Sequence, residues 1–257
     1  MKKNILLTIA YDGSEFHGWQ RQPDKPTVQG YLERVLTKLL REEVMLNGTS
    51  RTDAGVHALG QRASFEADVR IPIEKLARVI NNTLAGMEKG PFAISPVRIL
   101  KAEEKPESFH ARFDCRGKKY IYRICNSGEI SVFNRNYVYH VEAPLDITAM
   151  RKAAEYITGT HDFKCFQASG SDIRENTVRT IHSLKVIDDN TTGNMEIHVE
   201  GDGFLYNMVR IITGTLVDVG HGRIAPEELA GIIASGDRTR AGHTAPPYGL
   251  YLAEVYY

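Results

Sequence analysis

The stretch 47–61, NGTSRTDAGVHALGQ, organises the rest of the chain, because it lies between two segments that are typical of strands. Its glycines at 48, 55 and 60 permit positive φ angles, so we expect a tight turn. Asp53 lies near the centre of this turn, shortly after Arg51. A carboxylate on such a turn is a common way for an enzyme to present an acid, a base or a nucleophile. The alternative is an ordinary loop in which Asp53 binds nearby backbone, and the turn taken alone favours that alternative.

The segments around this turn predict a first set of strands and helices. Residues 4–11 are apolar and end at an Asp-Gly turn signal, which indicates a buried strand. Thr27 is a suitable N-cap for a helix whose apolar residues recur at helical spacing through Leu40. The other expected elements are strands at 44–46, 61–66 and 92–100 and a helix from Pro72 to Leu84. The order is strand, helix, strand, strand, helix, strand.

The second half of the chain repeats this order with one extra helix. It has expected strands at 118–125, 181–187, 195–200 and 250–255 and expected helices at 145–157, 205–219 and 226–234. Two βαββαβ units in tandem indicate an α+β fold of two ferredoxin-like halves with mainly antiparallel sheets. We expect the sheets to be joined around a central cleft. The charged segment 101–107 marks the boundary, which gives halves of residues 1–103 and 104–257.

The composition narrows the class of protein. The chain has 257 residues, and 32 basic residues balance 32 acidic ones, which argues against a globally basic nucleic-acid binder but permits a local basic groove. Its three cysteines fit no zinc-binding spacing and are expected to be reduced thiols. The apolar run at 5–10 is too short for a signal peptide, and no segment has the length of a membrane span. We therefore expect a soluble cytoplasmic protein with no membrane association.

Basic and aromatic residues are interleaved over residues 107–125. The basic ones are Arg112, Arg116, Lys118, Lys119 and Arg123, and the aromatic ones are Phe109, Phe113, Tyr120 and Tyr122. Such a segment suits phosphate contacts and base stacking. An amphipathic strand with one solvated, charged face explains the pattern equally well.

Arg210 is the charged residue of the apolar run NMVRIITG at 207–214. A guanidinium in such a run needs an acidic partner or a place at a helix edge. If Asp53 were that partner, the positive charge would keep the carboxylate ionised. The alternative is a narrow solvent-facing stripe that Arg210 shares with Asn207 and Asp218, and the residues alone slightly favour this alternative.

Motifs for metal, nucleotide and serine-nucleophile chemistry are missing from the sequence. The nine histidines form no HExxH or i, i+4 metal pair, and neither a glycine-rich phosphate loop nor a GxSxG elbow occurs. We therefore expect chemistry without a cofactor or a metal ion. A carboxylate, basic residues and tyrosines in a cleft suit a reaction on a nucleic-acid base.

Several long motifs, in order along nearly the whole chain, resemble the tRNA pseudouridine synthase A family. The first is GTSRTDAGVHALGQ at 48–61, which resembles the catalytic motif of that family. The others are YDGSEFHGWQRQ at 11–22, SFHARFDCRGKKYIYRI at 108–124, FLYNMVRIITGTL at 204–216 and GLYL at 249–252. The resemblance implies the pseudouridine synthase fold and the conversion of uridine to pseudouridine at positions 38 to 40 of the tRNA anticodon stem-loop. It also implies a homodimer in which one tRNA touches both subunits.

The resemblance also implies roles for individual residues. Asp53 matches the catalytic aspartate, Arg210 the basic residue that pairs with it, and Tyr120 the tyrosine that packs on the target base. Arg51 matches an arginine that assists in flipping the base out of its stack. The RNA-contacting stretches match Phe109, His110, Ala111, Arg112 and Phe113, and Gly170, Ser171, Asp172, Ile173 and Arg174. Ser50 departs from the glycine usual before the arginine, and the match at 170–180 needs a gap.

Two other functions remain open on the sequence. Aromatic residues on sheet faces would suit a non-catalytic RNA-binding protein with two RRM-like units, but no strand carries the RNP1 pattern of that class. A glycoside hydrolase would need a second carboxylate as prominent as Asp53, and none stands out.

Overall fold

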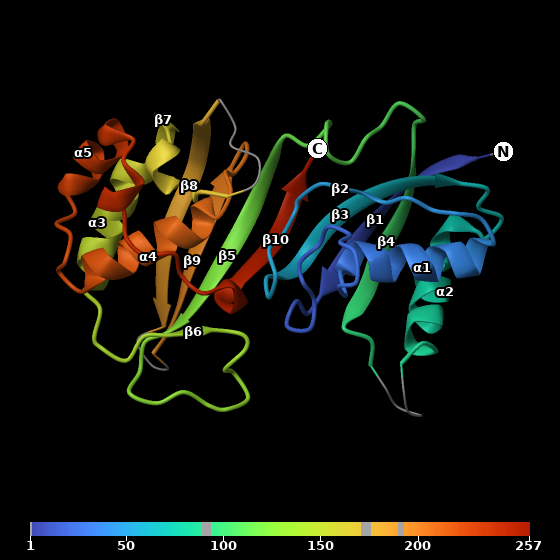
Figure 1. Ribbon diagram of the computed structural model, residues 1–257, viewed down its shortest axis with the longest axis horizontal. Coiled ribbons are helices and arrows are strands. Elements are labelled where there is room, and N and C mark those ends of the chain that lie inside the picture. Colours follow the sequence, from blue (N-terminus) through green and yellow to red (C-terminus); the bar gives the residue numbers. More distant parts are fainter. Residues whose placement is uncertain (1, 89–93, 171–175, 190–192) are drawn as a thin grey trace. The chain divides into compact units, whose positions relative to one another are not determined.

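The computed structural model describes residues 2–88, 94–170, 176–189 and 193–257 (Figure 1). The chain forms two compact units, one of residues 1–116 with 252–257 and the other of residues 117–251. The predicted division between residues 103 and 104 falls within a strand of the first unit, at residues 97–105. The first unit continues to residue 116. The last strand of the chain contributes its first two residues to the second unit and the others to the first.

The first unit is a βαββαβ arrangement. Its elements are β1 (Lys3–Tyr11), α1 (Val28–Leu40), β2 (Asn47–Gly48), β3 (His57–Ala67), α2 (Ile73–Ala85) and β4 (Val97–Lys105). The strand order is β4, β1, β3, with the short β2 beside β3, and the pairs are all antiparallel. This is the strand order of a ferredoxin-like unit. Figure 1 shows α1 and α2 on one face of this sheet.

Local sequence signals explain both helices of the first unit. Thr27 caps α1 by accepting a hydrogen bond from the Gly30 backbone N–H at 3.3 Å, as its residue type predicts. Arg41 ends the helix with a positive φ of 58°. The buried stripe of α1 includes Leu32, Val35 and Leu36, and that of α2 comprises Leu76, Ile80 and Leu84. The helical spacing of these apolar residues therefore predicts both helices correctly.

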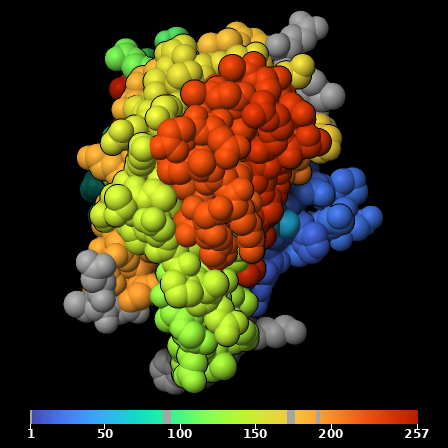
Figure 2. All heavy atoms as spheres, turned by 90° about the vertical axis from the view of Figure 1, so that its left-hand side faces the viewer, coloured from blue at the N-terminus to red at the C-terminus, as the bar shows by residue number. Residues whose placement is uncertain are grey.

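The second unit repeats the plan with additional short elements. Its elements are β5 (Gly117–Cys125), β6 (Tyr139–His140), α3 (Ile147–Ile157), β7 (Gly159–Asp162), β8 (Val178–Asp189), β9 (Asn194–Gly201), α4 (Met208–Gly220) and α5 (Glu228–Ser235). Short 3₁₀ turns lie at η1 (Lys164–Phe166), η2 (Arg238–Arg240) and η3 (Pro247–Gly249), and β10 (Leu250–Tyr256) ends the chain. The strand order is β5, β9, β8, β7, and these pairs are antiparallel. Figure 2 shows the C-terminal part of the chain that includes α5, in orange and red, at the surface that faces the viewer.

The predicted α+β class with mainly antiparallel strands is confirmed, but several boundaries differ. The strand expected at 44–46 is replaced by β2 at 47–48, and the strand expected at 92–100 is β4 at 97–105. The helix expected from Leu205 begins at Met208, because Asn207 adopts a left-handed conformation with φ of 59°. β6 and β7 have no counterpart among the expected strands.

Helix α4 is the most deeply buried helix of the second unit, and all of its residues except Arg210 are buried. Gly214 explains how a loop can lie directly on this helix. A Cβ at Gly214 would lie 1.9 Å from the His243 carbonyl oxygen, so a larger residue would push the loop away. The close approach holds residues 241–246 against the turn of α4 that carries Arg210.

No helix in the described ranges combines the length and the apolar composition that are needed to cross a membrane.

Candidate active site

Asp53 lies in the connection between β2 and β3, and its neighbour Thr52 fixes the backbone there. The Thr52 carbonyl accepts a hydrogen bond from the Trp19 backbone N–H at 3.0 Å, and the Thr52 hydroxyl lies 2.6 Å from the Tyr11 hydroxyl. The Asp53 carbonyl accepts from the Val56 N–H at 3.1 Å. These bonds satisfy main-chain groups that would be costly to bury without partners. The backbone is therefore held firmly while the Asp53 side chain stays partly exposed.

The side chain of Gln61 fixes the same turn from β3. Its amide nitrogen donates to the Ser50 carbonyl at 2.7 Å, and its amide oxygen accepts from the backbone N–H groups of Ser50 at 3.3 Å and Arg62 at 3.1 Å. Gln61 is fully buried, with 0% of its surface exposed. A buried amide with all these partners specifies one geometry, because any displacement would leave polar groups unpaired.

Two glycines of the motif meet distinct requirements. Gly55 adopts a φ of 77°, a conformation that side chains with a Cβ rarely tolerate. Gly48 lies beneath the indole of Trp19, and a Cβ there would lie 2.3 Å from the indole nitrogen. The turn around Asp53 is therefore shaped by backbone conformation on one side and by close packing of Trp19 on the other.

Thr49 joins the Asp53 turn to the segment 109–113. Its hydroxyl oxygen lies 3.0 Å from both the Arg62 and the Ala111 carbonyl oxygens, either of which can accept its one proton, and 2.8 Å from the Tyr257 hydroxyl. The Tyr257 hydroxyl also donates to the Ala111 carbonyl, at 2.9 Å. Burial raises the pKa of Tyr257 to about 12. The phenol is thus held in the neutral form that can donate.

We expect Tyr257 to make stability fall at alkaline pH. Its pKa is about 12 in the folded chain and near the ordinary 10 after unfolding, so the folded state retains the proton more strongly. The stabilisation is therefore complete below pH ~10 and is lost as the pH rises toward ~12. Tyr257→Phe should reduce this alkaline loss, measured by denaturant unfolding at several pH values. Tyr256→Phe, one residue earlier, should keep it, and equal curves for the wild type and Tyr257→Phe would contradict the assignment.

The segment 109–113 combines anchored and exposed side chains. The Phe109 ring packs on Tyr257 with centroids 5.0 Å apart, and Ala111 is buried. The His110 ring lies 4.3 Å from the ring of Phe113, which is 77% exposed, and Arg112 is also exposed. An exposed aromatic ring and a guanidinium on an anchored backbone can contact bases and phosphates.

The second unit carries Tyr120, on β5, and Arg210, in the first turn of α4. Tyr120 is only 8% exposed, and the ring of Phe204 packs edge-on against it with centroids 5.0 Å apart. Arg210 donates through Nε to the Ala245 carbonyl at 2.7 Å and through a terminal nitrogen to the Asn207 side chain at 2.9 Å. Arg210 is therefore oriented by residues of its own unit. The solvent-facing stripe that Arg210 would share with Asp218 is not present, because Asp218 is buried.

The predicted site residues are divided between the two units. Asp53, Arg51 and residues 109–113 belong to the first unit, where Thr49 links the turn to Ala111. Tyr120, Arg210 and Gly170 belong to the second. The pairing of Asp53 with Arg210 stays a prediction. Gly170 has a φ of 136°, and the predicted residues Ser171, Asp172, Ile173 and Arg174 lie outside the described residues.

Sequence reasoning did not single out Gln61, Tyr257 or Phe204. Gln61 belongs to the quoted motif, but its role depends on a side chain that turns back to Ser50 from the following strand. Tyr257 lies far along the chain from Thr49, so no local signal links them. Phe204 opens the motif FLYNMVRIITGTL, and its position there is the one available signal.

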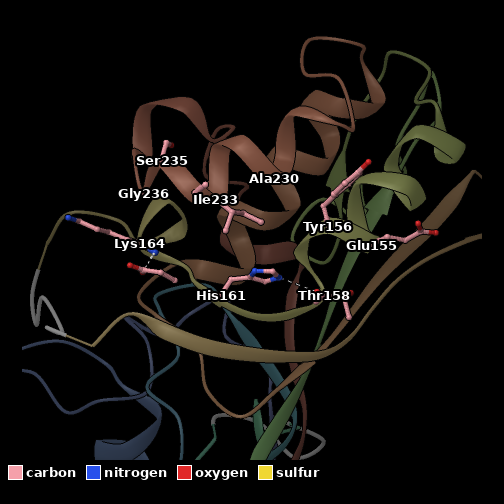
Figure 3. Close-up of a pocket in the computed structure, with 11 residues that line it drawn as sticks. Glu155, Tyr156, Thr158, His161, Lys164, Ala230, Ile233, Ser235 and Gly236 are labelled. Carbon is pink, nitrogen blue, oxygen red and sulfur yellow. Dashed lines mark hydrogen bonds between the residues drawn. The ribbon is translucent and has the colours of Figure 1, made fainter.

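The second unit also has an open cavity of about 720 Å³, between α5 and the end of α3 (Figure 3). Tyr156 and Glu155 lie at one end, Lys164 and Gly236 at the other, and His161 lies beneath Ile233. None of the predicted site residues lines this cavity. The cavity therefore lies apart from the residues that the sequence predicts for catalysis. Across the described ranges, His, Cys, Asp and Glu side chains form no group of three or more that could hold a metal ion.

Comparison with known proteins places the chain in a family. The family model for tRNA pseudouridine synthase matches residues 7–114 and 153–257. The chain is 46% identical to tRNA pseudouridine synthase A 2 of Clostridium tetani, with 100% of both chains covered. It is 48% identical to tRNA pseudouridine synthase A of Ruminiclostridium cellulolyticum, covering 99% of this chain and 100% of that one. Family model and relatives extend over nearly the whole sequence, and the chain therefore belongs to the tRNA pseudouridine synthase family, whose members are isomerases.

Proposed function

We propose that this protein converts uridine to pseudouridine at positions 38 to 40 in the anticodon stem-loop of tRNA, with Asp53 as the catalytic carboxylate. The main support is the Asp53 turn itself. Buried hydrogen bonds from Trp19 and Gln61 fix its backbone, while the Asp53 side chain stays partly exposed. An enzyme needs this combination for a group that must meet a substrate in one orientation.

The reaction detaches uracil at N1, rotates it and rejoins it to ribose through C5. The atoms of the nucleoside are conserved, so the reaction needs no redox cofactor. Asp53 would act near the sugar in one of three ways: by attack on C1′, by addition to C6 of uracil, or by removal of a proton from C2′. Each of these needs the ionised carboxylate in a fixed place.

Tyr120 and Arg210 supply the remaining chemistry in this proposal. Tyr120 packs on the target base and assists removal of the C5 proton, and its edge-on contact with Phe204 supports a fixed ring position. Arg210 pairs with Asp53 and keeps it ionised. Its bonds to Ala245 and Asn207 restrict the guanidinium before any substrate binds.

RNA recognition would use residues of both units. Arg51, which is exposed beside Asp53, would assist in flipping the target base out of the helix. Phe113 and Arg112 would contact the RNA from the segment anchored at Ala111, and residues 170–174 would do so from the second unit. We further propose that the enzyme acts as a homodimer in the cytoplasm.

The test uses tRNA labelled with tritium at C5 of uridine. Formation of pseudouridine replaces the C5–H bond with the new glycosidic bond, so each turnover should release one tritium to water. Chemical mapping of the product should then place pseudouridine at positions 38 to 40. A protein that binds this tRNA without releasing tritium would overturn the proposal in favour of a non-catalytic RNA-binding role.

A further inference from the structure

One face of the sheet in the first unit carries a charged cluster formed by Arg62, Lys101, Glu103 and Lys105. Thr8 on β1 lies opposite Arg62 on β3 and Lys101 on β4 in the strand register. Since alternate residues of a strand share a face, Lys101, Glu103 and Lys105 lie on the same side. We call these four residues the Glu103 cluster.

The cluster places three cations around one carboxylate. Glu103 accepts from a terminal nitrogen of Arg62 at 2.8 Å, and the ammonium groups of Lys101 and Lys105 lie 3.1 and 3.6 Å from its other oxygen. Arg62 also donates to the Thr8 hydroxyl at 2.7 Å. Within the cluster three positive charges face one negative charge, and Glu66, on the same face of β3, adds a second carboxylate across Asn4 from Lys105. The local excess of positive charge is therefore centred on Lys101 and Arg62, although the whole chain has no net charge. Such a patch attracts anions.

The cluster is also exposed enough for an anion to reach it. The side chain of Lys101 is 65% exposed and that of Lys105 is 30% exposed, while Arg62 and Glu103 are more covered. The Arg62 guanidinium lies over the Tyr257 ring, 5.6 Å from its centroid, which fixes its plane. Together with its bond to Thr8, this contact makes Arg62 a fixed positive charge within the cluster.

The cluster is continuous with the proposed RNA-contacting segment. The Arg62 carbonyl accepts a hydrogen bond from the backbone N–H of Thr49 at 2.8 Å. The cluster is therefore bonded directly to the segment that carries Asp53. The ammonium of Lys105 lies 5.8 Å from the centre of the Phe109 ring. Cations and anchored aromatic rings therefore adjoin on one surface, an arrangement that suits a nucleic-acid backbone better than a small free anion.

We propose that the Glu103 cluster binds a backbone phosphate of the RNA substrate, and that the carboxylate of Glu103 weakens this binding. This inference rests on the proposed function, because it takes RNA as the ligand. The exposed ammonium of Lys101 makes the contact, and the more covered Arg62 adds its positive charge to the patch. Glu103 holds them in place without RNA, and its charge repels the incoming phosphate.

The test measures the affinity of the full chain for an unmodified tRNA transcript over a range of KCl concentrations. Lys101→Gln should weaken binding several-fold and reduce the slope of log K against log salt by about 0.7 to 0.9, the value for one lost phosphate contact. Glu103→Gln should strengthen binding several-fold. The matched control is Glu104→Gln, which removes the same charge one residue away, on the other face of β4, where Glu104 pairs with Lys3.

The outcomes separate this inference from the proposed function. Equal tRNA affinities for Glu103→Gln and Glu104→Gln, or an unchanged salt slope in Lys101→Gln, would overturn the inference. The cluster would then be an ion network that only stabilises the fold. Thermal melting checks that each variant is folded, and Lys101→Gln keeps the test decisive if Glu103→Gln is unstable. Tritium release is recorded in parallel: its absence from the wild-type enzyme counts against the proposed function, whereas the binding data still decide the role of the cluster.

Discussion

Asp53→Asn is expected to lower the rate of pseudouridine formation by at least about 10³-fold while tRNA binding persists. The amide has nearly the shape of the carboxylate but lacks its charge and its basicity. The turn should survive the change, because the bonds that fix it come from the backbone of Asp53, from Thr52 and from Gln61. A melting curve of the variant checks that the fold is retained.

Single-turnover tritium release and tRNA affinity together measure this effect. The control is Asp68→Asn, which removes a carboxylate from the same unit, where it binds Arg70 at the surface. This control should keep full activity. If Asp53→Asn released tritium at the wild-type rate, Asp53 would have no catalytic role and the proposed chemistry would be wrong.

Local signals in the sequence were sufficient to predict the main elements of the fold. The Thr27 cap and the buried stripe of α1 are decided within a few residues of chain, and the structure contains both. The N-cap of α3, Asp146, is equally local. The Asp146 side chain accepts from the Ala149 N–H at 2.9 Å, as an N-cap should. Elements of this kind are predictable because their energetics are local.

Elements that depend on distant partners were not predictable in this way. The charged composition of residues 101–105 indicates a linker, yet these residues end β4, whose pairing with β1 supplies their hydrogen bonds. β7 has four residues and exists through its pairing with β8. The apolar residue Leu205 extends the helical pattern and so predicts an earlier start for α4, but the left-handed conformation of Asn207 delays the helix to Met208.

The same distinction applies to the candidate site. Asp53 stands out because its polar neighbours and glycines are adjacent in sequence. Tyr257 and Gln61 do not stand out, because their contributions arise from contacts with Thr49 and Ser50 that only the folded chain creates. A sequence motif thus identifies the reacting group more readily than it identifies the residues that hold this group in place.

Gln61→Met is expected to lower both stability and activity. The thioether keeps the length of the side chain but cannot pair with Ser50, so the Ser50 N–H and carbonyl lose their partners in a buried place. Unsatisfied buried groups of this kind cost about 1 to 3 kcal/mol each, so we expect a loss of about 3 kcal/mol in the free energy of unfolding. For a chain of this size, that loss lowers the melting temperature by about 6 to 12 °C.

The loss of activity in Gln61→Met should appear in kcat rather than in tRNA affinity. Ser50 lies three residues before Asp53, so a released Ser50 backbone lets the carboxylate leave its reactive position, and small displacements of a reacting group cost about 10²-fold. The matched control is Gln22→Met, because Gln22 is exposed and its amide makes one hydrogen bond, to the His17 carbonyl. That variant should change stability by less than about 0.5 kcal/mol. An unchanged kcat in folded Gln61→Met would mean that Trp19 and Tyr11 alone position the turn, and that the buried amide serves only the stability of β3.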